Sequence, residues 1–292
     1  MAVFRHLEMR LDRFLTLHIV RPLLRMRFPT EPRLPILMYH SISVDPENGR
    51  SAYYKVCTSP KRFAEHLQWL AENDYEGTTL RAGLERLSSM PSGTQRKPVA
   101  ITFDDGFRDF YTEAFPILQQ HSFQATMYLP TAFIADEPRQ FQSRGCMTWE
   151  QVAELHATGI EFGSHTITHP KLIELDWPGV EEELRESKST IENRLGTSVN
   201  SFAYPYAFPK AKKEFVSRFR QTLKKAGYQS CATTEIGRQK SGDDLLSLKR
   251  LPVNDEDDAP LLRAKIDGAY DWLAIPQSAA KAARHFLGSS GA

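Results

Sequence analysis

A chain of 292 residues has the length of one large domain or two ordinary ones, because single hydrophobic cores stop growing at roughly 250 to 300 residues. This length excludes a mini-protein. Hydrophobic residues make up 41% of the chain and charged residues 25%, which excludes an intrinsically disordered chain. The 37 basic and 36 acidic side chains leave a formal net charge of +1, so no overall field favours nucleic acid, and we expect no nucleic-acid partner.

The first 29 residues form a basic segment, with six arginines, two acids and a local net charge of +4. Leu7, Leu11 and Phe14 recur at helical spacing, which predicts an amphipathic helix. Pro22 predicts that the helix ends near Val20, with a break or a second short helix after it. Such a helix can lie in a membrane interface, and the alternative is a helix docked on its own domain or on a second subunit.

The cysteines and the hydropathy pattern bear on the compartment. Cys57, Cys146 and Cys231 lie far apart and form no Cys-x-x-Cys pair, which favours a reducing compartment over a disulfide framework or a cysteine-rich zinc module. No run reaches the ~20 apolar residues that cross a bilayer, and the N-terminus lacks an uninterrupted signal-peptide core. We therefore expect a cytoplasmic protein, at the inner membrane surface if the N-terminal helix binds lipid.

From Leu34 onward, apolar runs alternate with amphipathic stretches, and this alternation predicts an α/β fold. The expected strands cover residues 34–39, 99–103, 124–129, 160–163, 201–204, 229–232 and 246–253. Helix signals are Ser59 before Pro60, a capping box from Thr148 to Gln151, and Gly196 as a stop. An open doubly wound sheet and a closed or incomplete barrel both fit this pattern.

The most informative segment, Val99-Ala-Ile-Thr-Phe-Asp-Asp-Gly-Phe107, is an apolar strand that ends in two carboxylates and a glycine. Active sites of α/β proteins lie at such strand ends. Neighbouring side chains of a strand point to opposite faces, so Asp104 and Asp105 share one site only if the strand has ended in a turn, which Gly106 permits. An Asx-type turn that only closes the strand is the alternative.

A second strand end, Ile160-Glu-Phe-Gly-Ser-His-Thr-Ile-Thr-His169, carries two histidines four residues apart. On one helical turn this spacing places both imidazoles on the same face, where they can bind a divalent metal. With Asp105 they would form a His, His, Asp set with open positions for water and substrate. Asp104 would remain free to take a proton from water. A histidine pair on a surface or at a helix cap is the alternative.

These residues resemble a known family. Thr102-Phe-Asp-Asp-Gly106 and Ser164-His-Thr-Ile-Thr-His169 are similar to the first two motifs of the polysaccharide deacetylases, the NodB-homology carbohydrate esterases, and Phe202-Ala-Tyr-Pro-Tyr206 resembles a variant of the third. The resemblance runs from about residue 34 to residue 253. It implies a distorted (β/α) barrel of about seven strands, a divalent metal that is usually zinc, Asp104 as general base, and Asp105, His165 and His169 as metal ligands.

Two departures from the family pattern need replacements. The third motif has Ala203 where the family has an arginine that orients the base, and Arg250 could replace it from another strand end; an ordinary surface ion pair is the alternative. The family's C-terminal Leu-x-His is not evident. Leu37-Met-Tyr-His40 resembles the permuted arrangement of poly-N-acetylglucosamine deacetylases, so His40 is expected as general acid, with a buried structural histidine as the alternative. By resemblance, the backbone N–H of Tyr206 would help to stabilise the oxyanion.

Two charged stretches lie outside the motifs. The acidic run 255–258 is expected to be a solvated loop, with a cation site as the alternative. The lysines and arginines between residues 210 and 225 are expected to form a solvated face, with a contact to anionic lipid or glycan as the alternative.

The sequence therefore predicts a metal-dependent hydrolase that removes N-acetyl groups from an acetylated glycan. A deacylase of a lipid-linked or small-molecule amide is one alternative, and an inactive glycan-binding barrel, with Ala203 as the sign of lost catalysis, is another. The predicted organisation is a basic N-terminal segment over residues 1–29, a deacetylase barrel over 30–275 and a C-terminal tail over 276–292.

Overall fold

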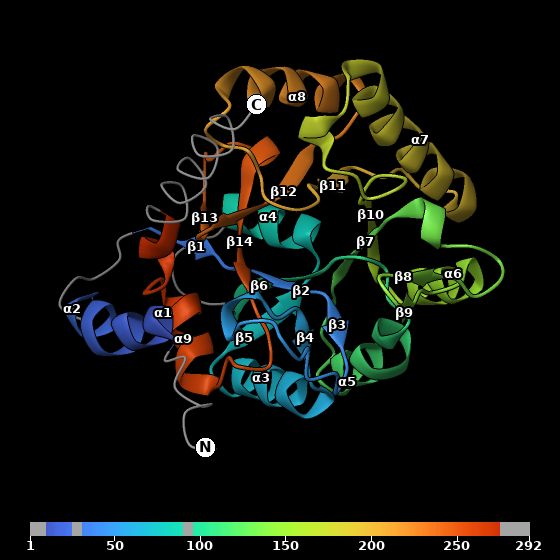
Figure 1. Cartoon of the computed structure of the whole chain (residues 1–292). Helices are drawn as coiled ribbons and strands as arrows, with labels where there is room; N and C mark the ends of the chain where they lie inside the picture. The colour runs from blue at the N-terminus through green and yellow to red at the C-terminus, as the bar shows by residue number, and fades with distance from the viewer. Residues whose placement is uncertain (1–9, 25–30, 90–95, 275–292) are drawn as a thin grey trace, which may run out of the picture.

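The computed structural model describes residues 10–24, 31–89 and 96–274, and the predicted tail 276–292 lies outside them. At its centre, seven parallel strands close into a barrel (Figure 1). Their order around the ring is β2-β14-β12-β11-β10-β7-β6, and pairing between β6 and β2 closes it. The strands are β2 (Ile36–Tyr39), β6 (Lys97–Phe103), β7 (Thr126–Leu129), β10 (Glu161–Ser164), β11 (Ser201–Ala203), β12 (Ser230–Ile236) and β14 (Leu248–Pro252). This confirms the barrel and rules out the open sheet.

Every barrel strand coincides with one of the seven apolar runs expected from the sequence. A further parallel strand, β5 (Tyr75–Thr78), pairs with the first half of β6 and was not expected. Three two-stranded sheets lie outside the barrel sheet. They are β1 (Arg33–Leu34) with β13 (Gln239–Lys240), β3 (Ser41–Ile42) with β4 (Cys57–Thr58), and β8 (Gln140–Phe141) with β9 (Arg144–Gly145).

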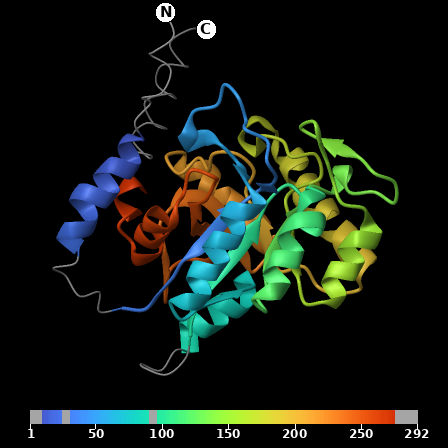
Figure 2. The same ribbon diagram turned by 90° about the horizontal axis from the view of Figure 1, so that it is seen from below.

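Helices surround the barrel, as Figures 1 and 2 show. The α-helices are α3 (Pro60–Glu72), α4 (Leu80–Ser89), α5 (Phe115–Gln120), α6 (Trp149–Ala157), α7 (Trp177–Leu195), α8 (Lys213–Lys225) and α9 (Ala259–Asp267). Short η segments are the π-turn η3 (Phe110–Ala114) and the 3-10 turns η2 (Ala52–Tyr54), η4 (Thr131–Phe133), η5 (Leu172–Glu174), η6 (Leu245–Ser247) and η7 (Asp271–Leu273).

The expected helix signals are confirmed. The Ser59 side chain caps α3, Thr148 and Gln151 form the capping box of α6, and Gly196 ends α7 in the left-handed conformation.

Alternation along each strand divides the core into two apolar clusters. On β6, Val99, Ile101 and Phe103 face outward into the larger cluster, which lies between the barrel and its helices. Ala100 belongs to a smaller cluster inside the barrel. Leu80 and Leu87 of α4 join this inner cluster, and the backbone N–H of Leu80 donates to Thr126 Oγ1 at the start of β7. Helix α4 therefore closes the barrel at the N-terminal ends of its strands and leaves the opposite mouth for the site.

The second short helix expected after Val20 is present, but it continues the N-terminal helix without a break. Helical backbone continues from α1 (Leu11–Leu15) through a π-turn, η1 (Thr16–Val20), into α2 (Arg21–Leu24), so Pro22 does not end it. A π-turn widens the backbone just ahead of the proline, which accommodates a ring that would clash with a regular preceding turn. None of the helices in the described parts of the chain is long and apolar enough to cross a membrane.

The expectation of a solvated loop for residues 255–258 is wrong. Asp255 accepts hydrogen bonds from the backbone and hydroxyl of Ser59, and Asp257 is fully buried against the Lys265 ammonium at 2.8 Å. Asp258 caps α9 and accepts two hydrogen bonds from Arg13. The run serves as an anchor for the N-terminal helix, because its carboxylates meet cations that lie far away in the sequence.

Candidate active site

Inward-facing rows of side chains end in polar groups at the open mouth of the barrel. On β6, the row that contains Ala100 and Thr102 continues to Asp104, just beyond the strand. On β2, the row that begins with Ile36 continues to His40. Because the carboxyl ends of parallel strands lie at the same end of a barrel, Asp104 and His40 both lie at the same mouth.

Two further strands contribute in the same way. On β14, Leu248 lies inside the barrel and Arg250 follows on the same face. On β10, Gly163 precedes His165 by two residues. A Cβ at Gly163 would lie 2.5 Å from the ring of Tyr128, so only glycine leaves room for that inner aromatic side chain.

Asp105, His165 and His169 form a buried cluster of metal-ligand type. Asp105 Oδ1 lies 3.5 Å from His165 Nε2 and 3.4 Å from His169 Nε2. Two ligand atoms about 2.1 Å from one tetrahedral ion are roughly 3.4 Å apart, so the spacing fits a shared cation. Among the residues that the structure describes, this is the one group of three or more metal-ligand side chains close enough to bind a common ion.

Hydrogen bonding around the cluster also fits a metal. The Nδ1–H of His165 donates to the carbonyl oxygen of Ala203 at 2.8 Å, which leaves the Nε2 lone pair facing Asp105. Asp105 Oδ1 is buried and has no hydrogen-bond partner within the described structure. A buried carboxylate oxygen without a donor is costly, and a cation between it and the two imidazoles would satisfy it.

The surroundings shift the pKa values of the two histidines in opposite directions. Burial lowers the pKa of His169 to about 4, assisted by the nearby charge of His165, so His169 is neutral at physiological pH. Burial opposes charge on His165 as well, but the carboxylates of Asp105 and Asp104 raise its pKa above the ordinary value. The carboxylates thus favour the charged form of His165, and a metal at the cluster would compete with that proton.

The loop that carries the histidines is not the helical turn that the four-residue spacing suggested. Residues 165–169 form an irregular segment after β10, in which Thr166 and His169 have positive φ of 72° and 56°. A helix residue that sequence reasoning missed holds this loop. The buried Glu183 carboxylate of α7 accepts hydrogen bonds from the backbone N–H groups of Ile167 and Thr168, at 2.7 and 3.1 Å, and from the Thr168 hydroxyl at 2.6 Å.

The paired aspartates occupy the expected turn. β6 ends at Phe103, and Asp105 adopts a positive φ of 76°, followed by Gly106 at 64°. A Cβ at Gly106 would lie 2.9 Å from the Ile134 side chain. The turn therefore sends Asp104 toward the barrel axis and Asp105 toward the histidines, and such left-handed non-glycine residues concentrate at functional sites.

Asp104 is held by Arg250. Two parallel hydrogen bonds, of 2.7 and 2.8 Å, join the guanidinium to the two carboxylate oxygens. Burial would raise the pKa of Asp104, but the charge of Arg250 lowers it well below the usual range. The arginine is itself 1% exposed, and its Nε–H donates to the carbonyl oxygen of Thr233 at 3.0 Å. The ion pair is therefore internal, and it reaches the base from β14 while Ala203 occupies the position on β11.

The remaining predicted residues border this centre. His40 Nε2 lies 3.9 Å from Asp104 Oδ2, and the His40 side chain is 19% exposed, between the buried carboxylate and solvent. Tyr206 has a positive φ of 56°, and its ring lies 4.6 Å from the His169 ring, between centroids. The structure thus brings all seven predicted site residues to one mouth of the barrel.

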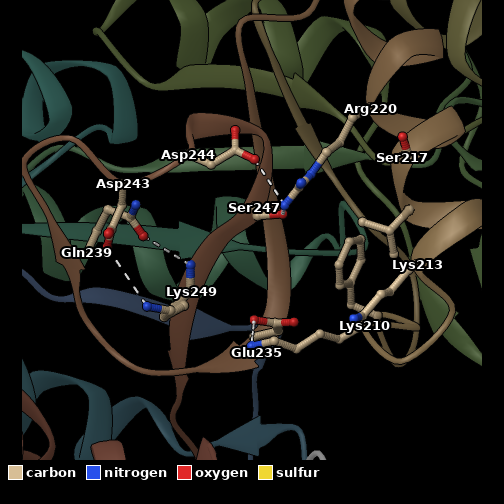
Figure 3. Close-up of a pocket in the computed structure, with 12 residues that line it drawn as sticks. Lys210, Lys213, Ser217, Arg220, Glu235, Gln239, Asp243, Asp244, Ser247 and Lys249 are labelled. Carbon is tan, nitrogen blue, oxygen red and sulfur yellow. Dashed lines mark hydrogen bonds and ion pairs between the residues drawn. The ribbon is translucent and has the colours of Figure 1, made fainter.

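A polar cavity of about 370 Å³ lies apart from this mouth, between α8, β13 and β14 (Figure 3). Lys210, Lys213 and Arg220 of the basic stretch line it. Two of them pair with an acid: Lys210 with Glu235 at 2.9 Å and Arg220 with Asp244 at 3.0 Å. Acids thus neutralise two cations of the basic stretch, one before α8 and one on it, and none of the residues predicted for catalysis lines the cavity.

A closed (β/α) barrel with an Asp, His, His cluster beside a second, arginine-bound carboxylate defines a hydrolase of the NodB type, and comparison with known proteins agrees. The family model for polysaccharide deacetylase matches residues 92–231. YxkH of Bacillus subtilis (strain 168), which is named as a polysaccharide deacetylase, is 31% identical over 242 residues, 82% of this chain and 76% of that protein. The chain belongs to the polysaccharide deacetylase family and is a hydrolase of carbon–nitrogen bonds other than peptide bonds.

More distant relatives share part of the chain or its fold. The poly-beta-1,6-N-acetyl-D-glucosamine N-deacetylase of Escherichia coli (strain K12) is 31% identical over 134 residues, 42% of this chain and 19% of that protein. The structure of the Streptococcus pyogenes deacetylase PplD in complex with acetate is similar with a TM-score of 0.69 at 26% identity, over 81% of this chain and 99% of that one.

Proposed function

We propose that this protein removes N-acetyl groups from a carbohydrate, either a polysaccharide or a glycan precursor, and that it does so with a divalent metal, which we take to be zinc. The observation that carries the proposal is the pairing at the barrel mouth of an ionised, arginine-bound Asp104 with the Asp105, His165, His169 cluster. Two imidazoles and a carboxylate form a donor set that suits zinc. Acetate in the PplD structure and the substrate named for the Escherichia coli relative support hydrolytic removal of an acetyl group from an amino sugar.

Asp105, His165 and His169 would hold the metal, which supplies polarisation of the acetyl carbonyl and a lower pKa of water at the site. Asp104 takes the proton from the water that attacks the carbonyl carbon. Arg250 holds both carboxylate oxygens and so keeps this base ionised and fixed in orientation.

Collapse of the tetrahedral intermediate expels the sugar amine, which must gain a proton. We assign this donation to His40, because its Nε2 lies 3.9 Å from Asp104 Oδ2 and its side chain is 19% exposed, whereas the Asp104 side chain is 3% exposed. The backbone N–H of Tyr206 would stabilise the oxyanion, and the ring contact between Tyr206 and His169 ties this segment to the cluster.

Acetate release from chitooligosaccharides and from polymeric N-acetylglucosamine, with and without a chelator, tests the proposal. We expect release that the chelator abolishes and added zinc restores. Glycan binding without acetate release from any acetylated substrate, by protein shown to contain metal, would favour a binding barrel instead. A membrane location is a separate proposal, because it depends on the N-terminal helix and not on the site.

A further inference from the structure

The N-terminal helix differs from an ordinary surface helix, because charged and hydroxyl side chains bind it to the domain while several of its large apolar side chains are exposed. Surface helices of globular proteins normally turn their apolar stripe toward the core. Here charged and hydroxyl groups make the hydrogen bonds to residues in and just before α9 and η7. They join Arg10 to Asp257, Asp12 to the Tyr270 hydroxyl, Arg13 to Asp258, and Thr16 to the indole N–H of Trp272, over distances of 2.6 to 3.4 Å.

The outward side of the same helix is apolar. Leu11, Phe14, Ile19 and Leu23 are 61%, 43%, 46% and 62% exposed. They come from successive turns of α1, η1 and α2, and we call these four side chains the outer face. Figure 2 shows the helix at the edge of the molecule, beside the C-terminal helical region. A set of exposed, large apolar side chains on one helix marks a surface that binds another apolar phase.

Charge near the outer face indicates what that phase is. The sequence places Arg5 before the described helix and Arg25 and Arg27 after it, and Glu8 is the one acid of residues 1–29 besides Asp12, which the domain binds. Arg10 and Arg13 meet aspartates of the domain. An apolar helix face with arginines in its flanking sequence matches the interface of a bilayer that contains anionic lipid. Pairing with a second copy would bring like charges together.

We propose that the outer face inserts into the interfacial region of an anionic phospholipid bilayer and holds the enzyme at the membrane surface. The salt bridges of Arg10 to Asp257 and of Arg13 to Asp258 then hold the helix against the domain. The helix can therefore lie flat in the membrane interface while its polar side remains bound to the barrel. This accounts for both sides of the helix: one binds the domain by charge and hydrogen bonds, and the other remains available to lipid.

Co-sedimentation of the full-length protein with vesicles tests the proposal without reference to catalysis. The probes are vesicles of phosphatidylethanolamine with phosphatidylglycerol, and vesicles of phosphatidylcholine alone. We expect the wild-type protein to partition onto the anionic vesicles and only weakly onto the neutral ones. The double variant F14S/L23S should lose about tenfold or more in partition coefficient, because two large apolar side chains no longer leave water.

The matched control is Leu245→Ser, which removes an exposed leucine (45%) on η6, far from this helix in the sequence. It should bind vesicles as the wild type does, and both variants should keep wild-type turnover of a soluble oligosaccharide. Equal partitioning of F14S/L23S and wild type would overturn the proposal. So would a wild-type dimer in sedimentation velocity that F14S/L23S makes monomeric, with no vesicle binding, since a second copy would then cover the outer face.

Discussion

A carboxylate as deeply buried as that of Asp104 stays ionised only when a cation compensates the loss of water. Arg250 does so with two hydrogen bonds. Burial is the largest single effect on the Asp104 pKa, and the charge and hydrogen bonds of Arg250, together with the nearby histidines, outweigh it. The third motif has Ala203 and therefore supplies no guanidinium, but Arg250 of β14 brings one to the same carboxylate.

Replacement of Arg250 should therefore act through the base. In Arg250→Ala, burial raises the pKa of Asp104, so the base binds a proton at a higher pH than in the wild type. We expect turnover near neutrality to fall by about 100-fold and the acid limb of the kcat/KM profile to move to higher pH. Arg250→Lys keeps the positive charge but cannot form the two parallel hydrogen bonds, so its turnover should lie between that of the wild type and that of Arg250→Ala. An unchanged profile in a folded Arg250→Ala protein would make the ion pair purely structural.

The role of His40 can be separated from that of the base by the choice of leaving group. An amine must be protonated as it departs, whereas nitrophenolate leaves without a proton. His40→Ala should lose about 100-fold or more on an N-acetyl sugar and little on 4-nitrophenyl acetate, with metal content unchanged. Equal losses on both substrates would contradict the assignment of His40 as general acid.

At the scale of elements, the histidine loop depends on α7. Glu183 accepts hydrogen bonds from the Ile167 and Thr168 backbone and so stabilises a loop that contains left-handed residues. Glu183→Ala should weaken zinc binding by about 10- to 100-fold, because groups that orient metal ligands carry effects of this size. Glu182→Ala, an exposed neighbour on the same helix, is the control. Competition with a chromogenic chelator measures both, and equal affinities would show that α7 does not support the loop.

The N-terminal helix should detach from the domain as the pH falls below about 4. The Asp258 pKa is lowered from its ordinary value of 3.8: burial opposes this, but hydrogen bonds from Arg13 and the Leu261 backbone prevail. A carboxylate with a lowered pKa stabilises the folded state above pH 3.8, and that stabilisation disappears as the pH falls through the lowered value. Hydrogen exchange, corrected for intrinsic rates, should show residues 10–24 losing protection below about pH 4 before the barrel strands do. Protection that persists until the barrel unfolds would contradict this expectation.

At the scale of the molecule, the sequence predicts the barrel well because its strands are buried on both faces and read as apolar runs with polar ends. Strand β5 escapes prediction because Tyr-Glu-Gly-Thr has no such run and is defined by its pairing with β6. The ligand residues can be predicted because they adjoin strand ends. The backbone of the 165–169 loop cannot, since Glu183 imposes it from a later helix. The outward orientation of the N-terminal helix depends on carboxylates about 245 residues away and is likewise non-local.

The proposed function depends above all on Asp104 as the base for removal of an acetyl group from an amino sugar. Its most direct test is acetate release from an N-acetylglucosamine oligomer by the wild type and by Asp104→Asn, both loaded with zinc and shown to contain equal metal. We expect steady release by the wild type and a loss of at least about 100-fold in the variant, with metal binding retained. Equal release by the two proteins, or none by the metal-loaded wild type, would contradict it.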